Sequence, residues 1–178
     1  MDIEVISSSV PYRGKVITVR LDELVDSRGS RFRREVAIVA DSVAVVAIDD
    51  LNNVLLISQY RHPVGARMWE IPAGRLDVEG ESPEQAALRE LAEEVDLKAT
   101  SAQKLGVFGN SIGWTTEMTT VYLVRQFIKT DRFARRHEEA SLETRWVPLS
   151  DAINEITSGV IRDAKTIVGL LLADRFVN

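Results

Sequence analysis

Four charged residues in the middle of the chain have a spacing that could assemble a metal site. Arg89, Glu90, Glu93 and Glu94 lie within the segment RELAEE. If this segment is helical, the three glutamates are three and four residues apart and project from one face. Like charges at that spacing repel one another, and a hard cation such as Mg2+ removes the repulsion because it prefers oxygen ligands. The pattern therefore indicates a site for Mg2+ or Mn2+, with these glutamates as candidate ligands.

The alternative for any one of these acids is an ordinary solvated helix face. If each charged type makes up about 6% of residues, four fixed charged letters at fixed spacing occur by chance in a chain of this length with a frequency on the order of 10^-3. The residues just before the cluster also have the features of a helix start. Ser82 can act as the N-cap, Pro83 suits the first helical position, and Gln85 stands three residues after the cap. We expect a helix from there to about Val95.

The complete segment resembles the signature of the Nudix hydrolase family. Gly74 matches the glycine that opens the family pattern, and Glu81 matches its first glutamate, eight residues before Arg89. Six residues separate Gly74 from Glu81, one more than is common, and Asp96 stands where the family has its closing glycine. We expect Asp96 to adopt the left-handed conformation that ends a helix, which aspartate tolerates better than most residues.

The resemblance implies roles for residues at matching positions. Glu90 and Glu94 are the expected metal ligands, and Glu93 would share the metal or act on the attacking water. The backbone carbonyl of Ala73 is expected as a further ligand. The implied chemistry is metal-assisted attack of water on a diphosphate.

A longer stretch, roughly residues 12–175, resembles the ADP-ribose pyrophosphatase branch of this family. The matching segments are RREV at 33–36, QYRH at 59–62, WEIPAG at 69–74 and DAKT at 163–166. In that branch the general base comes from a late loop, which corresponds here to HEEASLE at 137–143. Glu139 is the first candidate for the base and Glu138 the second. The alternative is a polar loop in which neither is catalytic.

The same resemblance assigns substrate contacts. Arg61 is expected to hold a phosphate, because a guanidinium fork suits phosphate oxygens. Arg34 is a candidate for the nucleotide end, with a surface ion pair as the alternative. Trp69 could stack on the base or belong to the core. Glu117 would position substrate or metal water, unless it is a partner in a loop salt bridge.

One position departs from the pattern of ADP-ribose specificity. The branch has a proline in a loop that corresponds to SIGWTTE at 111–117, and here the position is Ile112. ADP-ribose or a related sugar nucleotide remains the leading substrate class. GDP-mannose-like and UDP-sugar substrates stay open.

The strands and helices expected around these residues indicate an α+β fold. Apolar, β-branched runs at 34–40, 42–48 and 54–57 read as strands, after a first strand at 15–19 and a turn at 26–30. Further strands are expected at 105–108, 118–127 and 143–147. Ser150 is expected to cap a helix that ends near Gly159, and a last helix spans 164–176. The result is a Nudix-like α/β/α sandwich: a mixed β-sheet with a central helix and C-terminal helices.

Two domains are expected. Residues 1–40 form a small N-terminal β-subdomain, and residues 41–178 form the hydrolase domain. A few short strands are not stable alone, so they must pack on something. The resemblance implies that they are exchanged between the subunits of a homodimer, with packing on their own subunit as the alternative.

Composition limits the other functions. The chain has 178 residues and a formal net charge of −5, which argues against a general nucleic-acid binder. It has no cysteine, so disulfides and thiolate metal sites are excluded. No apolar run approaches the roughly 20 residues of a membrane span, and no secretory signal opens the chain, so a cytoplasmic location is expected.

The sequence therefore predicts metal-dependent hydrolysis of the diphosphate in a nucleoside diphosphate sugar, giving a nucleoside monophosphate and a sugar phosphate. One alternative is a non-catalytic Nudix module that senses a ligand, but this chain keeps all the helix acids. The other is a Nudix hydrolase of dinucleoside polyphosphates or nucleoside triphosphates.

Overall fold

The computed structural model describes residues 2–130 and 142–177. The chain divides into two compact units, one made of Met1–Asp41 with Gly109–Met118 and the other of Ser42–Phe108 with Thr119–Asn178. Each unit is described by itself. Within the described residues, no helix combines the length and the apolar character that crossing a bilayer requires.

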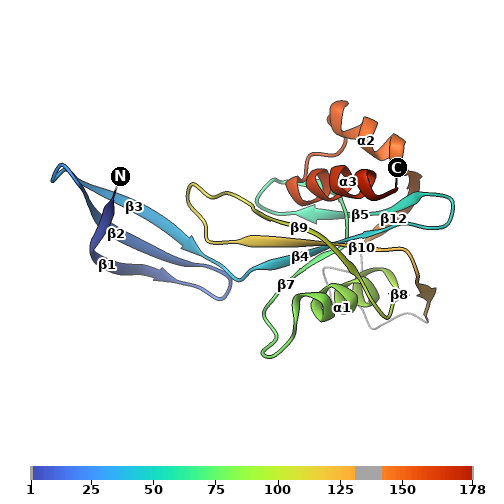
Figure 1. Ribbon diagram of the computed structural model, residues 1–178, viewed down its shortest axis with the longest axis horizontal. Helices are drawn as coiled ribbons and strands as arrows, with labels where there is room; N and C mark the ends of the chain where they lie inside the picture. Colours follow the sequence, from blue (N-terminus) through green and yellow to red (C-terminus); the bar gives the residue numbers. More distant parts are fainter. Residues whose placement is uncertain (1, 131–141, 178) are drawn as a thin grey trace. The chain divides into compact units, whose positions relative to one another are not determined.

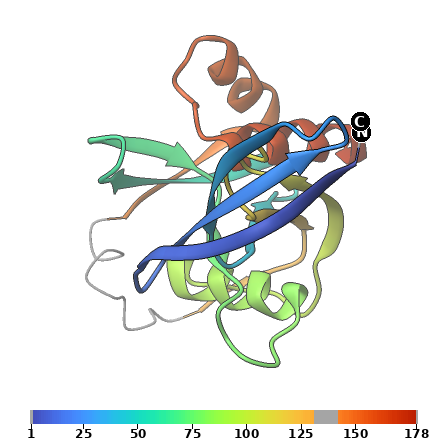
Figure 2. The same cartoon turned by 90° about the vertical axis from the view of Figure 1, so that its left-hand side faces the viewer.

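The first unit is built on an antiparallel sheet in the order β1-β2-β3 (Figure 2). Its strands are β1 (Ile3–Arg13), β2 (Thr18–Asp26) and β3 (Arg31–Ile38). The turn predicted at 26–30 is confirmed: Asp26 Oδ1 accepts hydrogen bonds from the backbone N–H groups of Arg28 and Ser30, both at 2.9 Å. Gly29 lies in this turn with a φ of 83°, a region that favours glycine.

The strand predicted at 15–19 starts later, at Thr18, because Gly14 N–H donates to the Ile17 carbonyl at 2.8 Å and closes a turn there. The segment 109–118 also belongs to this unit, although the sequence did not indicate it. Ala37 N–H donates to the Trp114 carbonyl at 2.7 Å, and Ala37 forms a parallel bridge with Thr115. The loop that carries Ile112 is therefore attached to β3.

The second unit contains a mixed sheet in the order β7-β4-β10-β9. Strand β4 (Ser42–Ala47) is parallel to β10 (Met118–Val124) and antiparallel to β7 (Ala73–Arg75), and β9 (Gln103–Gly109) is at the edge. A separate antiparallel sheet has the order β12-β5-β6, with β5 (Asn53–Arg61), β6 (Ala66–Glu70) and β12 (Glu143–Pro148). The short strands β8 (Leu97–Lys98) and β11 (Ile128–Lys129) pair with each other.

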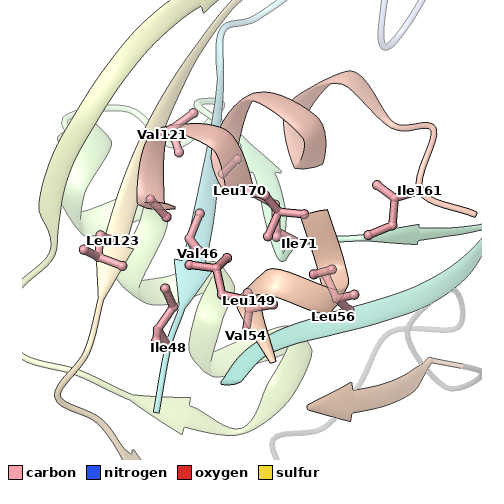
Figure 3. Packing of buried hydrophobic residues seen from close by; sticks show 13 residues of the cluster. Val46, Ile48, Val54, Leu56, Ile71, Val121, Leu123, Leu149, Ile161 and Leu170 are labelled. Carbon is pink, nitrogen blue, oxygen red and sulfur yellow. The ribbon is translucent and has the colours of Figure 1, made fainter. Parts of the chain in front are cut away.

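Helices cover both faces of the mixed sheet (Figure 1). They are α1 (Pro83–Val95), α2 (Leu149–Thr157) and α3 (Ala164–Val177). Side chains of β4 alternate between the two faces, as the two-residue period of a strand requires. Val43, Val45 and Ala47 pack in the cluster of α1, whereas Ala44, Val46 and Ile48 pack in the cluster of α2 and α3. Figure 3 shows the cluster that packs against α2 and α3. The predicted α/β/α sandwich is confirmed.

The predicted N-cap of α2 is wrong. The helix begins at Leu149, directly after Pro148, and no side chain caps it, so Ser150 is already a helical residue. The reason is tertiary: Leu149 N–H donates to the carbonyl of Asn52 at 3.0 Å, which satisfies an N-terminal donor without a hydroxyl. Strand β10 also ends at Val124, three residues earlier than the predicted end at residue 127.

Candidate active site

Helix α1 starts and ends where the sequence predicts. Ser82 Oγ accepts a hydrogen bond from Gln85 N–H at 3.3 Å, and Gln85 Oε1 accepts one from Ser82 N–H at 2.9 Å, which completes a capping box. Pro83 occupies the first turn. Asp96 terminates the helix with φ 58° and ψ 31°, the left-handed conformation expected of the residue that replaces glycine. The helix therefore places Glu90, Glu93 and Glu94 on one face, as predicted.

Arg89 holds the centre of the acidic face. Its guanidinium donates to both carboxylate oxygens of Glu81, each at 2.9 Å. It also donates to Glu90 at 2.6 Å and to Glu93 at 3.3 Å. Its hydrogen bonds to Glu81, then those to Glu90, raise the pKa of Arg89, although partial burial opposes this. In return, the Arg89 hydrogen bond lowers the pKa of Glu81. One arginine thus orients three carboxylates.

Glu90 and Glu94 both lie against the short segment that opens β7. Glu94 is 7% exposed, and its Oε2 accepts a hydrogen bond from Ala73 N–H at 3.1 Å. A Cβ on Gly74 would lie 2.0 Å from the carboxyl carbon of Glu90 and 2.1 Å from its Oε1. Any other residue at position 74 would displace this carboxylate, so Gly74 is needed for close approach. Two carboxylates and the Ala73 backbone therefore converge, although they come from α1 and β7.

These groups fit a hard divalent cation. The available donors are carboxylate and carbonyl oxygens, which suit Mg2+, and Mg2+ usually takes only one or two protein carboxylates. Across residues 2–130 and 142–177, no three acidic, histidine or cysteine side chains are gathered into a ready-made metal cage. Around Arg89, however, Glu81, Glu90 and Glu93 are three carboxylates paired with one guanidinium. These three carboxylates outnumber the guanidinium that they share, and a bound divalent cation would offset part of their charge.

Arg61 is engaged by a residue that the sequence analysis did not single out. Its Nε and Nη2 donate to the two oxygens of Glu70 at 2.8 and 2.6 Å. Glu70 is 1% exposed. The Glu70 hydrogen bonds raise the pKa of Arg61 against the opposing effect of burial, and the charges of Glu94 and Asp163 add to this. The signal for Glu70 was a single acid inside the apolar strand MWEI, since a buried carboxylate needs a partner.

The other expected substrate residues have structural contacts of their own. Trp69 is half-buried, packs against the core cluster, and has the Arg145 guanidinium 4.0 Å from its ring centroid. Arg34 belongs to the first unit, where its guanidinium lies 4.7 Å from the Phe32 ring centroid. Glu117 belongs to the first unit too, and its carbonyl accepts from Asn110 N–H at 3.2 Å.

The candidate bases Glu138 and Glu139 lie outside the described residues.

The NUDIX domain family matches residues 39–168 of the chain. This chain belongs to the NUDIX family. It is 38% identical over 170 residues to an ADP-ribose pyrophosphatase of Mycobacterium tuberculosis, covering 96% of this chain and 82% of the relative. It is 33% identical over 155 residues to an ADP-ribose pyrophosphatase of Bacillus subtilis, covering 87% and 83%.

A solved structure described as an ADP compounds hydrolase superposes on this chain with a TM-score of 0.89. The superposition covers 99% of this chain and 95% of the solved chain. At 21% identity this likeness shows the fold. The resemblance inferred from the acid cluster is therefore confirmed, and the protein is a Nudix hydrolase.

Proposed function

We propose that this Nudix enzyme hydrolyses the diphosphate of a nucleoside diphosphate sugar, ADP-ribose first among them. The products are a nucleoside monophosphate and a sugar phosphate. The observation that carries the proposal is the convergence of Glu90 and Glu94 on Ala73 and Gly74. The relatives named as ADP-ribose pyrophosphatases, which match along most of the chain, support the substrate class.

Mg2+ or Mn2+ would be held by Glu90, Glu94 and the Ala73 carbonyl, with Glu93 beside them. Once bound, the cation supplies charge neutralisation at the diphosphate and lowers the pKa of the attacking water. The chain supplies the positioning. Arg89 holds the Glu90 and Glu93 carboxylates in place, and the Ala73 N–H does the same for Glu94.

The general base of the proposal is Glu139, with Glu138 as the second candidate. A general base acts on the transition state, so Glu139→Gln should lower kcat with little change in substrate affinity. Glu138→Gln is the matched control, because it removes one carboxylate from the same loop. If Glu138→Gln is the damaging change and Glu139→Gln is harmless, the base is Glu138.

Arg61, Arg34, Trp69 and Glu117 are proposed as substrate contacts. Arg61 would contact a phosphate with the part of its guanidinium that Glu70 does not occupy, since its side chain remains 39% exposed. Ile112 is 85% exposed in the loop where the ADP-ribose branch carries proline. This exposed isoleucine keeps a second candidate substrate class open, the GDP- and UDP-sugars.

We also propose a homodimer in which the strands of residues 1–40 cross to the partner. Every residue of β1 is exposed, and Ile3, Val5 and Val10 are 53%, 55% and 44% exposed. Apolar side chains along an edge strand call for a partner surface.

Changing Val5 and Val10 together to Lys should shift the mass measured by light scattering towards monomer. Leu51→Lys, at an 81% exposed loop position, is the control. A full-length protein that is monomeric at micromolar concentration and turns over normally would contradict the dimer.

The decisive experiment is a substrate panel with Mg2+ or Mn2+ and with the nucleotide and phosphate products resolved. The panel contains ADP-ribose, GDP-mannose, a UDP-sugar, a dinucleoside polyphosphate and a nucleoside triphosphate. We expect the highest kcat/KM with ADP-ribose or another diphosphate sugar, and a nucleoside monophosphate as product. Preference for the polyphosphate or triphosphate would overturn the proposed substrate class. Tight ADP-ribose binding without turnover would identify a ligand-sensing module instead.

A further inference from the structure

The start of α3 is hydrogen-bonded to the segment that leads into Gly74, 95 residues earlier in the chain. Thr166 Oγ1 accepts from Ile71 N–H at 2.9 Å, and both residues are 0% exposed. The same hydroxyl donates to Asp163 Oδ2 at 2.8 Å. A hydroxyl has one proton to donate, and a backbone N–H can only donate. The Asp163 carboxylate therefore takes the proton and leaves a lone pair of Thr166 for Ile71.

Asp163 is itself held in place. Its Oδ2 also accepts from Thr166 N–H at 2.9 Å, and its Oδ1 accepts from Lys165 Nζ at 2.9 Å. The carboxylate is thus held turned towards the hydroxyl, and the Thr166 proton points to Asp163 and not to Ile71.

Helix α3 touches Ile71 a second time, through Gly169. A Cβ on Gly169 would lie 2.7 Å from Ile71 Cδ1 and 3.1 Å from Val46 Cγ2. Residues 166 and 169 are three apart and share a helix face. The helix therefore fixes both the backbone and the side chain of Ile71.

The next two residues are held by other elements. The Pro72 carbonyl accepts from Val45 N–H of β4 at 2.8 Å. Ala73 N–H donates to Glu94 of α1 at 3.1 Å. Consecutive backbone groups from Ile71 to Ala73 are thus anchored to α3, β4 and α1 in turn. Because a backbone carbonyl has no rotamers of its own, the direction of the Ala73 carbonyl is set by these anchors.

We propose that Thr166 is a positioning residue for the divalent cation, acting through Ile71 on the Ala73 carbonyl, with Asp163 orienting its hydroxyl. The inference rests on the proposed function, in which Ala73 is a metal ligand. Thr166 touches neither that ligand nor the metal-binding carboxylates in the contacts described above. Its role is comparable to that of the outer groups that orient metal ligands, whose loss commonly lowers metal affinity about 10- to 100-fold.

The test compares Thr166→Val with Thr166→Ser in the full-length protein. Valine keeps the shape and loses the hydroxyl, whereas serine keeps the hydroxyl. Mn2+ binding is measured by electron paramagnetic resonance without substrate, and the Mg2+ concentration for half-maximal activity is measured separately. We expect Thr166→Val to raise the Mn2+ Kd about tenfold, and Thr166→Ser to restore most of the affinity. The Mg2+ requirement should rise in parallel.

Thr119→Val controls for loss of stability alone. Thr119 is also 0% exposed, and its hydroxyl is hydrogen-bonded to Ser42 Oγ at 2.7 Å, a contact that does not involve Ile71. It should lower the melting temperature and leave the Mn2+ Kd unchanged. An Mn2+ Kd for Thr166→Val equal to that of the parent, or an equal rise for Thr119→Val, would overturn the inference.

Failure of the proposed function looks different, because the parent itself would then bind no Mn2+ or hydrolyse no diphosphate sugar. If Thr166→Val does not fold, Asp163→Asn decides, since it keeps the Thr166 hydroxyl and removes the charge of the acceptor that orients it, together with the ion pair to Lys165. We expect a smaller rise in the Mn2+ Kd for that variant, and unchanged affinity would overturn the inference.

Discussion

The second unit contains two groups of polar side chains that stabilise carboxylates in different ways. At the start of α3, Asp163 is matched by Lys165 and by two hydrogen bonds from Thr166. Burial opposes ionisation there, but the Lys165 charge and these hydrogen bonds outweigh it and lower the pKa of Asp163. This cluster is complete without any ligand.

On the acidic face of α1, several carboxylates lie near one cationic side chain. Glu81, Glu90 and Glu93 share the guanidinium of Arg89, and Glu94 lies on the same helix face with only 7% exposure. At the start of α3 one carboxylate has its own cationic partner, whereas on α1 three carboxylates share one guanidinium, and this surplus of carboxylates over cations is what favours the proposed metal site there. Three variants test this difference, from the largest expected effect to the smallest.

Glu94→Gln should disrupt the proposed metal site and leave the fold intact. We expect kcat to fall about 100-fold or more, because a bound cation contributes several kcal/mol to the transition state and each 1.36 kcal/mol is a factor of ten. Stability without metal should be unchanged or higher, since one of several like charges is removed. Steady-state kinetics and thermal unfolding measure both, with Glu79→Gln at an exposed loop position as control. Near-normal turnover at saturating Mg2+ would contradict the assignment.

Arg89→Lys should loosen the same site without changing its charge. Lysine cannot form the two-oxygen contact with Glu81 while also reaching Glu90 and Glu93. We expect about a tenfold loss of metal affinity, as for other groups that orient ligands. Titration of activity with Mg2+ measures it, and the loss should shrink at saturating metal. A variant with a normal Mg2+ requirement would show that Arg89 is not needed to orient the carboxylates.

Asp163→Asn should affect stability by a smaller amount and in a pH-dependent way. We expect a loss of about 2 kcal/mol at neutral pH, the usual range for hydrogen bonds to a charged group. The folded-state pKa of Asp163 is lowered, so its stabilisation is present above the ordinary carboxyl pKa and is lost as the pH falls through the folded value. Urea unfolding at pH 7 and pH 3 should therefore show a difference between parent and variant that shrinks at pH 3. An equal difference at both pH values would contradict this origin of the stabilisation.

Local sequence by itself determined where α1 begins and ends and which of its acids share a face. Ser82, Pro83 and Gln85 define its start, and Asp96 ends it, because caps depend only on hydrogen bonds within a few residues. The three- and four-residue spacing of its acids follows from helix periodicity alone. The sandwich was predictable for the same reason, since the period of each apolar run indicates strand or helix.

Only the tertiary structure decided the contacts between distant segments. Ser150 is not a cap, because the carbonyl of Asn52 already accepts from Leu149 N–H. The Thr166 hydroxyl accepts a hydrogen bond from Ile71 N–H, 95 residues away in the sequence. No local pattern around Thr166 indicates which backbone group it will contact. A hydrogen bond of this kind depends on how α3 packs on the sheet, and that packing is set by the summed burial of the core.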